Sequence, residues 1–213
     1  MIKNVVKVPF QKLKHIHHIS DIQIRNLKRH TEYEEVFNRL YEKVKENKDN
    51  AVAYIGGDIA HSKTEMSPEL VDQLSRLFKN LADICPTIII AGNHDCNLNN
   101  RSRLDVFTPI VDNLNHPNLH YLKDSGVYKC ADTTFVVWDC WTDEKDFILS
   151  KDKVVFEKFF LNLIIVFFIL FHSSFSLRFL DPVRVDSPPM STIEAPSLTI
   201  DLIFFFCFSF GIK

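Results

Sequence analysis

The chain has 213 residues, of which 46% are hydrophobic and 24% charged, the composition of a globular domain with room for a substantial core. Its formal net charge of -2 lacks the basic excess that dedicated nucleic-acid binders usually carry. The five cysteines form no C-x-x-C pair and no apolar signal peptide precedes them, which disfavours zinc fingers and disulfide frameworks. We therefore expect an intracellular protein, cytoplasmic or nuclear.

The first predicted strand covers residues 15–20 and leads directly into Asp21. We assign the three histidines of this run to the strand rather than to a metal site. A helix is expected next, because Thr31 and Glu34 have the spacing of a capping box and apolar residues then recur at helical spacing. Those apolar residues are Tyr33, Val36, Phe37, Leu40, Tyr41 and Val44.

The next elements have clear sequence boundaries. Residues 51–55 form an apolar run of strand length that ends at two glycines. A second helix should begin with Ser67 as its N-cap and Pro68 at its first position. Its expected apolar face comprises Leu70, Val71, Leu74, Leu77, Phe78 and Leu81. The β-branched run at residues 87–91 is typical of a strand that is buried on both faces of a sheet.

These elements predict a β-α-β-α-β arrangement. Right-handed crossovers would make its three strands parallel, and ligands of such sheets bind beyond the carboxyl ends of the strands. Further along the chain, residues 103–114 are expected to form a short helix. Shorter strands are expected at residues 119–121, 127–129 and 134–138.

The composition changes after residue 153. Of the 19 phenylalanines, 13 lie at or after Phe156, and the apolar run at residues 159–171 is shorter than the roughly 20 residues of a membrane span. We therefore divide the chain into a domain at residues 1–153 and a phenylalanine-rich tail at residues 154–213. We interpret the tail as not being the native continuation of the domain, as an unspliced intron, a frame shift or a gene-model error would produce. The alternatives are a membrane anchor and a buried hairpin or helix.

Three polar clusters follow the three predicted strands: Asp-Ile-Gln at residues 21–23, Gly-Asp-Ile-Ala-His at residues 57–61 and Gly-Asn-His-Asp at residues 92–95. Each cluster alone is a weak signal. One helix and one strand separate each cluster from the next, so their order predicts that all three meet at one edge of the sheet. Turn residues that cap a structural or nucleotide-binding sheet are the alternative reading.

Carboxylate, amide and imidazole groups at this edge would suit two divalent cations, which promote phosphate ester hydrolysis by activating water and compensating phosphoryl charge. Asp58 is the candidate bridging ligand. Asp21 would add a second carboxylate and Asn93 a neutral oxygen. Gln23 stands where a histidine would be a better ligand.

His94 and Asp95 are the candidate catalytic residues: His94 would protonate the leaving oxygen and Asp95 would orient its ring. His61 is interpreted either as a substrate or supporting contact or as a loop histidine with no ligand role. Arg25, just after the first cluster, is a candidate phosphate contact, with solvated surface charge as the default. Cys96 is expected to be a small buried or loop residue rather than a nucleophile.

At these residues the chain resembles the calcineurin-like metallophosphoesterase superfamily, whose signature runs Asp-x-His, Gly-Asp-x-x-[Asp/His], Gly-Asn-His-[Asp/Glu], a separate His and Gly-His-x-His. Because the second motif ends in His61, the chain is similar to the DNA double-strand-break repair branch typified by the SbcD nuclease subunit. The resemblance covers residues 14–141. It implies an α/β fold with a layered β-sheet and flanking helices, of which the βαβαβ arrangement is the core. It also implies a manganese-dependent exonuclease and endonuclease with two divalent metal ions, acting on DNA as a homodimer with a coiled-coil ATPase of the SMC type.

Two departures from the family pattern lead us to expect a truncated or altered C-terminal part and impaired activity. Gln23 replaces a metal-binding histidine with a neutral oxygen ligand, and no Gly-His-x-His follows His120. His172 is the candidate for the separate histidine. The expected metal ligands are thus Asp21, Gln23, Asp58 and Asn93, and the expected catalytic residues are His94 and Asp95.

Two other functions compete with the nuclease. One is a non-catalytic DNA-repair interaction module that has lost metal ligands, which the glutamine at position 23 suggests. The other is a membrane-tethered phosphoesterase acting on a small phosphodiester, which the apolar run at residues 159–171 suggests. We expect no membrane contact under the main interpretation.

Overall fold

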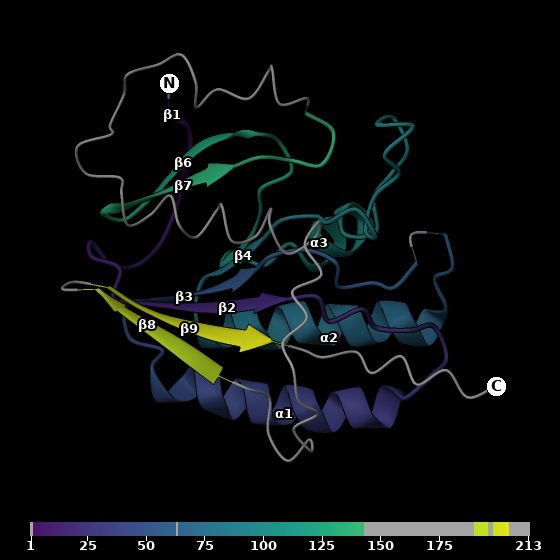
Figure 1. Ribbon diagram of the computed structural model, residues 1–213, viewed down its shortest axis with the longest axis horizontal. Coiled ribbons are helices and arrows are strands. Elements are labelled where there is room, and N and C mark those ends of the chain that lie inside the picture. The colour runs from purple at the N-terminus through teal and green to yellow at the C-terminus, as the bar shows by residue number, and fades with distance from the viewer. Residues whose placement is uncertain (1, 63, 143–189, 196–197, 205–213) are drawn as a thin grey trace, which may run out of the picture.

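The computed structural model of the chain describes residues 2–62, 64–142, 190–195 and 198–204 (Figure 1). Its larger sheet has the strand order β5-β4-β3-β2-β9-β8. All neighbours in this sheet run parallel except β8, which is antiparallel to β9. The strands are β2 (His15–Ser20), β3 (Ala51–Ile55), β4 (Thr87–Ile89), β5 (Leu119–Tyr121), β8 (Met190–Ala195) and β9 (Leu198–Phe204).

The predicted β-α-β-α-β core is confirmed. Two helices, α1 (His30–Glu46) and α2 (Pro68–Ile84), connect β2 to β3 and β3 to β4, and Figure 1 shows both on the same face of the sheet. Every residue of β3 and β4 is buried. Parallel pairing of β2 with β3 and of β3 with β4 therefore brings the ends of all three strands to one edge.

The helix signals were partly right. The hydroxyl oxygen of Ser67 accepts a hydrogen bond from the backbone N–H of Leu70 (3.2 Å), so the predicted N-cap of α2 is confirmed. Val71, expected on the buried face of α2, is 37% exposed instead. The capping box predicted for α1 was wrong. The helix begins at His30, directly after Arg29, whose backbone is in the left-handed region, and Thr31 already lies inside the first turn.

A second sheet packs on the other face of the larger one. It contains β1 (Ile2–Val6), β6 (Gly126–Cys130) and β7 (Thr133–Val137) in the order β1-β6-β7. Buried residues of both sheets form one apolar cluster, while a second cluster fills the space between the larger sheet and the helices. The sequence signals missed β1, because it takes its hydrogen bonds from β6, far along the chain, and no local turn marks it.

The third helix is shorter than predicted. We expected a helix from Arg103 to Leu114, whereas α3 spans only Thr108–Leu114. The carboxylate of Asp105 accepts hydrogen bonds from the backbone N–H groups of Phe107 (2.9 Å) and Thr108 (2.7 Å). These bonds form a turn immediately before the helix, so the chain cannot be helical through this segment.

Most of the tail lies outside the described residues, including the apolar run at residues 159–171 and His172. Of the tail, β8 and β9 are described, and β9 pairs with β2 from His15↔Thr199 to Ser20↔Phe204. The predicted boundary after residue 153 stays a prediction. Among the described helices, none is both long enough and apolar enough to span a bilayer.

Candidate functional site

The first and second polar clusters run side by side beyond β2 and β3. The backbone N–H of Asp21 donates to the carbonyl of Gly57 (3.3 Å), and that of Gln23 donates to the carbonyl of Asp58 (3.0 Å). Asp21, Gln23 and Asp58 all have positive φ angles, at 54°, 48° and 52°. Left-handed backbone is uncommon for residues other than glycine, and it turns the chain sharply at all three candidate ligands.

The second and third clusters approach each other so closely that glycine is required at two positions. A Cβ atom on Gly92 would lie 2.1 Å from Oδ1 of Asp58 and 2.5 Å from its backbone nitrogen. Gly57 has a φ angle of 88°, and a Cβ atom there would lie 2.6 Å from the backbone nitrogen of Gly92. The two glycines therefore allow the loops after β3 and β4 to touch backbone to backbone.

Asp95 holds these loops together from within. Its side chain is fully buried: Oδ2 accepts from the backbone N–H groups of Asp58 (2.7 Å) and Gly92 (2.9 Å), and Oδ1 accepts from Ile59 (3.1 Å) and Ala60 (3.0 Å). Burial raises the pKa of Asp95 to about 7, while these N–H groups favour its ionised form. Because both oxygens face only donors, a proton on the carboxyl would have no acceptor, and the geometry favours the carboxylate.

The predicted contact between Asp95 and the ring of His94 was therefore wrong, because the carboxylate accepts hydrogen bonds from four backbone N–H groups instead. The Nδ1–H of His94 donates to the carbonyl of His61 (3.1 Å), and its backbone N–H donates to Oδ1 of Asp58 (3.0 Å). A carbonyl only accepts, so the proton of the neutral His94 ring lies on Nδ1, and Nε2 is the nitrogen that exchanges a proton. The rings of His61 and His94 stack with centroids 6.1 Å apart, and Nδ1 of His61 faces Oε1 of Gln23 (3.4 Å).

The candidate ligands have suitable donor atoms for a divalent cation, but the described residues do not form a complete metal site. Asp21, Gln23 and Asn93 are partly exposed at this edge, and Asp58 is 8% exposed. Their carboxylate and amide oxygens form the hard donor set that magnesium and manganese prefer. No three His, Cys, Asp or Glu side chains converge on one point in the part of the chain that the structure describes, and the candidate His172 lies outside it.

The motif order, the parallel strands and the meeting of the three loops agree with the comparison to known proteins. A model of the calcineurin-like phosphoesterase family matches residues 14–177, well over half of the chain. The chain belongs to the calcineurin-like phosphoesterase family. This membership implies a hydrolase that acts on phosphoesters, and such enzymes generally use divalent metal ions.

One curated relative of this calcineurin-like chain is the uncharacterized protein R555 of Acanthamoeba polyphaga mimivirus. The two are 45% identical over 148 residues, which is 68% of this chain and 11% of the relative. The chain thus spans about a tenth of the length of the relative it matches.

Sequence reasoning missed several contacts that shape the site. Residue type could not show that Asp95 joins the two loops, which we call the Asp95 clamp. An aspartate after His94 could equally orient the His94 ring or accept hydrogen bonds from the loop backbone. Cys96, expected to be buried, is fully buried, but its sulfur also lies 2.7 Å from that of Cys140. Because the two cysteines are 44 positions apart in the sequence, no spacing rule indicates such a pair.

Proposed function

We propose that this domain hydrolyses phosphodiester bonds in DNA, as an exonuclease and endonuclease of double-strand-break repair that uses two divalent cations, manganese being the expected metal. The observation that carries this proposal is the stacking of His61 on His94, beside a buried Asp58 that accepts from the backbone of His94. A histidine at the end of the second motif is the form seen in the DNA-repair branch, and its ring lies at the motif loops. A homodimer and an SMC-type ATPase partner belong to the same proposal.

In this proposal the four oxygen ligands are Asp21, Gln23, Asp58 and Asn93. Divalent cations at such a site activate water and compensate charge on the phosphoryl oxygens. Oδ1 of Asp58 already accepts from the backbone of His94, and the two oxygens of this side chain keep further lone pairs for a cation. As the imidazolium, the ring of His94 would give its Nε2 proton to the leaving oxygen, while its Nδ1–H stays bound to the carbonyl of His61.

Arg25 is the proposed contact for a DNA phosphate. Ile24 and Ala60 form a parallel bridge, which places Arg25 and His61 next to each other along the two loops. Burial lowers the pKa of His61, and the charge of Arg25 and the ring of His94 lower it further. The site edge therefore presents a fixed guanidinium beside a neutral imidazole, a combination that can bind a phosphate oxygen without a second fixed charge.

The test is cleavage of linear single-stranded and double-stranded DNA with manganese. We expect slow, manganese-dependent cleavage that Asp58→Ala abolishes. Arg25→Ala should raise KM severalfold and weaken its salt dependence, because one phosphate contact is lost. The matched control is Arg39→Ala, which removes an exposed arginine of α1 and should change neither quantity. Cleavage that persists in Asp58→Ala, or that needs no divalent metal, would refute the proposal.

A non-catalytic DNA-binding module is the second candidate, and one observation favours it. Oε1 of Gln23 faces Nδ1 of His61 at 3.4 Å, so the glutamine oxygen already has a partner within the protein. A domain of this kind would bind DNA with manganese present and leave it intact. The cleavage assay distinguishes the two candidates, since binding without any product supports the module.

A further inference from the structure

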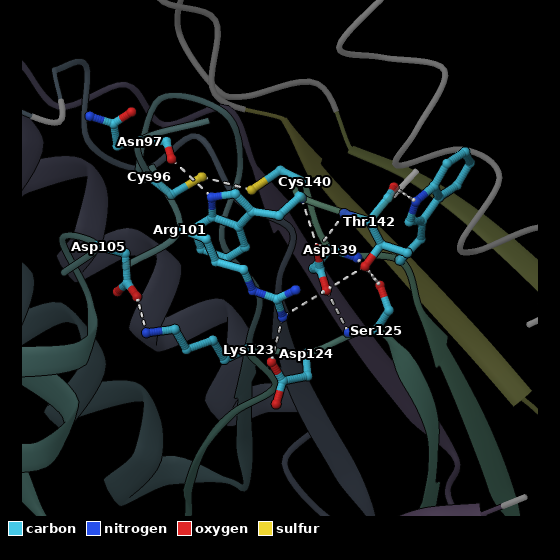
Figure 2. A network of polar contacts seen from close by, with 12 residues as sticks. Cys96, Asn97, Arg101, Asp105, Lys123, Asp124, Ser125, Asp139, Cys140 and Thr142 are labelled. Carbon is cyan, nitrogen blue, oxygen red and sulfur yellow. Dashed lines mark hydrogen bonds and ion pairs between the residues drawn. The ribbon is translucent and has the colours of Figure 1, made fainter. Parts of the chain in front are cut away.

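Two cysteines outside the proposed ligand set, Cys96 and Cys140, lie in contact next to the third polar cluster, residues 92–95 (Figure 2). The sulfur atoms of Cys96 and Cys140 are 2.7 Å apart. Cys96 directly follows Asp95 and is fully buried, whereas Cys140 lies just after β7 and is partly exposed. The pair therefore connects the loop after β4 with the end of the second sheet.

Polar contacts on the Cys140 side fix the loop after β7. Oδ1 of Asp139 accepts from the backbone N–H groups of Trp141 and Thr142 (2.8 Å each), and Oδ2 accepts from that of Ser125 (2.7 Å). Burial opposes ionisation, but the hydrogen bonds, led by those of Ser125 and Trp141, lower the pKa of Asp139. Cys140 thus lies in a turn in which the ionised carboxylate of Asp139 binds the backbone of the two residues that follow Cys140.

Contacts between the two loops flank the sulfur atoms. The indole N–H of Trp141 donates to the carbonyl of Asn97 (2.9 Å), so the residues following both cysteines are joined directly. The guanidinium of Arg101 lies 5.7 Å from the centre of the Trp141 ring. A disulfide needs a sulfur separation of about 2.05 Å, and the pair is already within about 1 Å of it.

We propose that Cys96 and Cys140 form an intramolecular disulfide when the domain meets a mild two-electron oxidant such as hydrogen peroxide. The sulfur of Cys140, the more exposed of the two residues, attacks one peroxide oxygen as the thiolate, which breaks the O–O bond and gives a sulfenic acid and, after protonation, water. The sulfur of Cys96 then attacks the Cys140 sulfur, forming the S–S bond and expelling the hydroxyl as a second water. Two thiols are oxidised and one peroxide is reduced to two waters.

The two other cysteines that the structure describes are poor competitors. Burial raises the pKa of Cys85 to about 11 and that of Cys130 to about 12, so both stay protonated. A metal is also a poor occupant of the Cys96 and Cys140 pair, because the described residues contain no group of three His, Cys, Asp or Glu side chains arranged around an ion.

Oxidation would act on the third motif directly. The thiol of Cys96 donates to the carbonyl of Gly92 (3.2 Å), and a disulfide removes this donor. It also ties the loop that carries Asn93 and His94 covalently to the end of the second sheet. This inference does not depend on the proposed nuclease activity.

The test treats the purified full chain, first reduced, with a small excess of hydrogen peroxide, followed by alkylation and tryptic peptide mapping. Tryptic peptides 80–101 and 130–145 each contain a second cysteine, so the assignment is made in Cys85→Ala/Cys130→Ala and, independently, by fragmenting the wild-type cross-linked peptide. We expect one bond, between Cys96 and Cys140, and a rise in Tm of about 5 °C. Both effects should vanish in Cys140→Ser and be reversed by dithiothreitol.

Several results would overturn the inference. These are a bond from either cysteine to Cys207, a disulfide between two chains, or both thiols still open to alkylation after peroxide treatment. Oxidation of Cys140 to the sulfinic acid without any bond to Cys96 would also contradict it, because Cys96 would then not reach the sulfenic acid.

Discussion

Oδ2 of Asp95 lies 2.7 Å from the backbone nitrogen of Asp58, although the two residues are 37 positions apart in the sequence. The same oxygen also accepts from the backbone of Gly92 at 2.9 Å. A single carboxylate oxygen therefore joins the loops that follow two adjacent parallel strands. Stability and site geometry should both depend on it.

Asp95→Asn should destabilise the domain strongly. The amide keeps one oxygen, so its NH2 group must face two backbone N–H donors, which leaves buried groups without acceptors. We expect a loss of at least about 3 kcal/mol in the free energy of unfolding, measured by urea denaturation. Asp112→Asn, at an exposed position of α3, is the control and should cost less than about 0.5 kcal/mol. Equal stability of the two variants would disprove the clamp.

Gly92→Ala should destabilise the chain more than Gly56→Ala. The added methyl group at Gly92 would meet Asp58 at 2.1 Å (Oδ1) and 2.5 Å (backbone N), and the backbone cannot move aside without parting the two loops. At Gly56 the nearest atom, at 2.8 Å, is Nε2 of His18, the far end of a side chain. We expect thermal unfolding to show a cost of about 3 kcal/mol at Gly92 and about half of that at Gly56. A reversed order would contradict the packing described for these loops.

Asp105 should contribute to stability in a pH-dependent way. Burial alone would raise its pKa, but hydrogen bonds from Lys123 and Thr108 outweigh burial and hold the pKa of Asp105 below its usual value. Its contribution is therefore fully present above the unfolded-state pKa near 3.9 and is lost as the pH falls through the lower folded-state pKa. We expect Asp105→Asn to flatten the decline of unfolding free energy between about pH 5 and pH 2. An unchanged slope would show that Asp105 is not involved.

Gln23→His should strengthen manganese binding if the first motif contributes a ligand. Imidazole is a better donor than a neutral amide oxygen for manganese and similar metals, and the position faces His61 across the loops. Isothermal titration should show an affinity at least about tenfold higher than that of the natural chain. Gln23→Ala is the matched control and should bind no more tightly than the natural chain. Equal affinity in all three proteins would remove Gln23 from the ligand set.

Local signals predicted the elements that position the site. The uninterrupted apolar run of β3 and the Ser-Pro start of α2 each lie within a few residues, and both agree with the structure. Parallel pairing followed from their alternation with helices. The order of the three clusters then indicated which sheet edge would carry them.

The remaining features depend on contacts between distant segments. Partners far along the chain decide that β1 pairs with β6 and that Cys96 meets Cys140. The bonding of Asp95 was misjudged for a related reason. Residue type shows that an aspartate can accept hydrogen bonds, but only the packed loops show that four backbone N–H groups face it.

The clamp formed by Asp95 binds main-chain atoms, and main-chain atoms are the same whatever side chain a residue carries. Candidate ligands such as Gln23 and Asn93 can therefore change identity during evolution while the loops that present them keep their shape. A lineage of such domains could lose, exchange or regain its chemistry by single substitutions without first having to rebuild the scaffold.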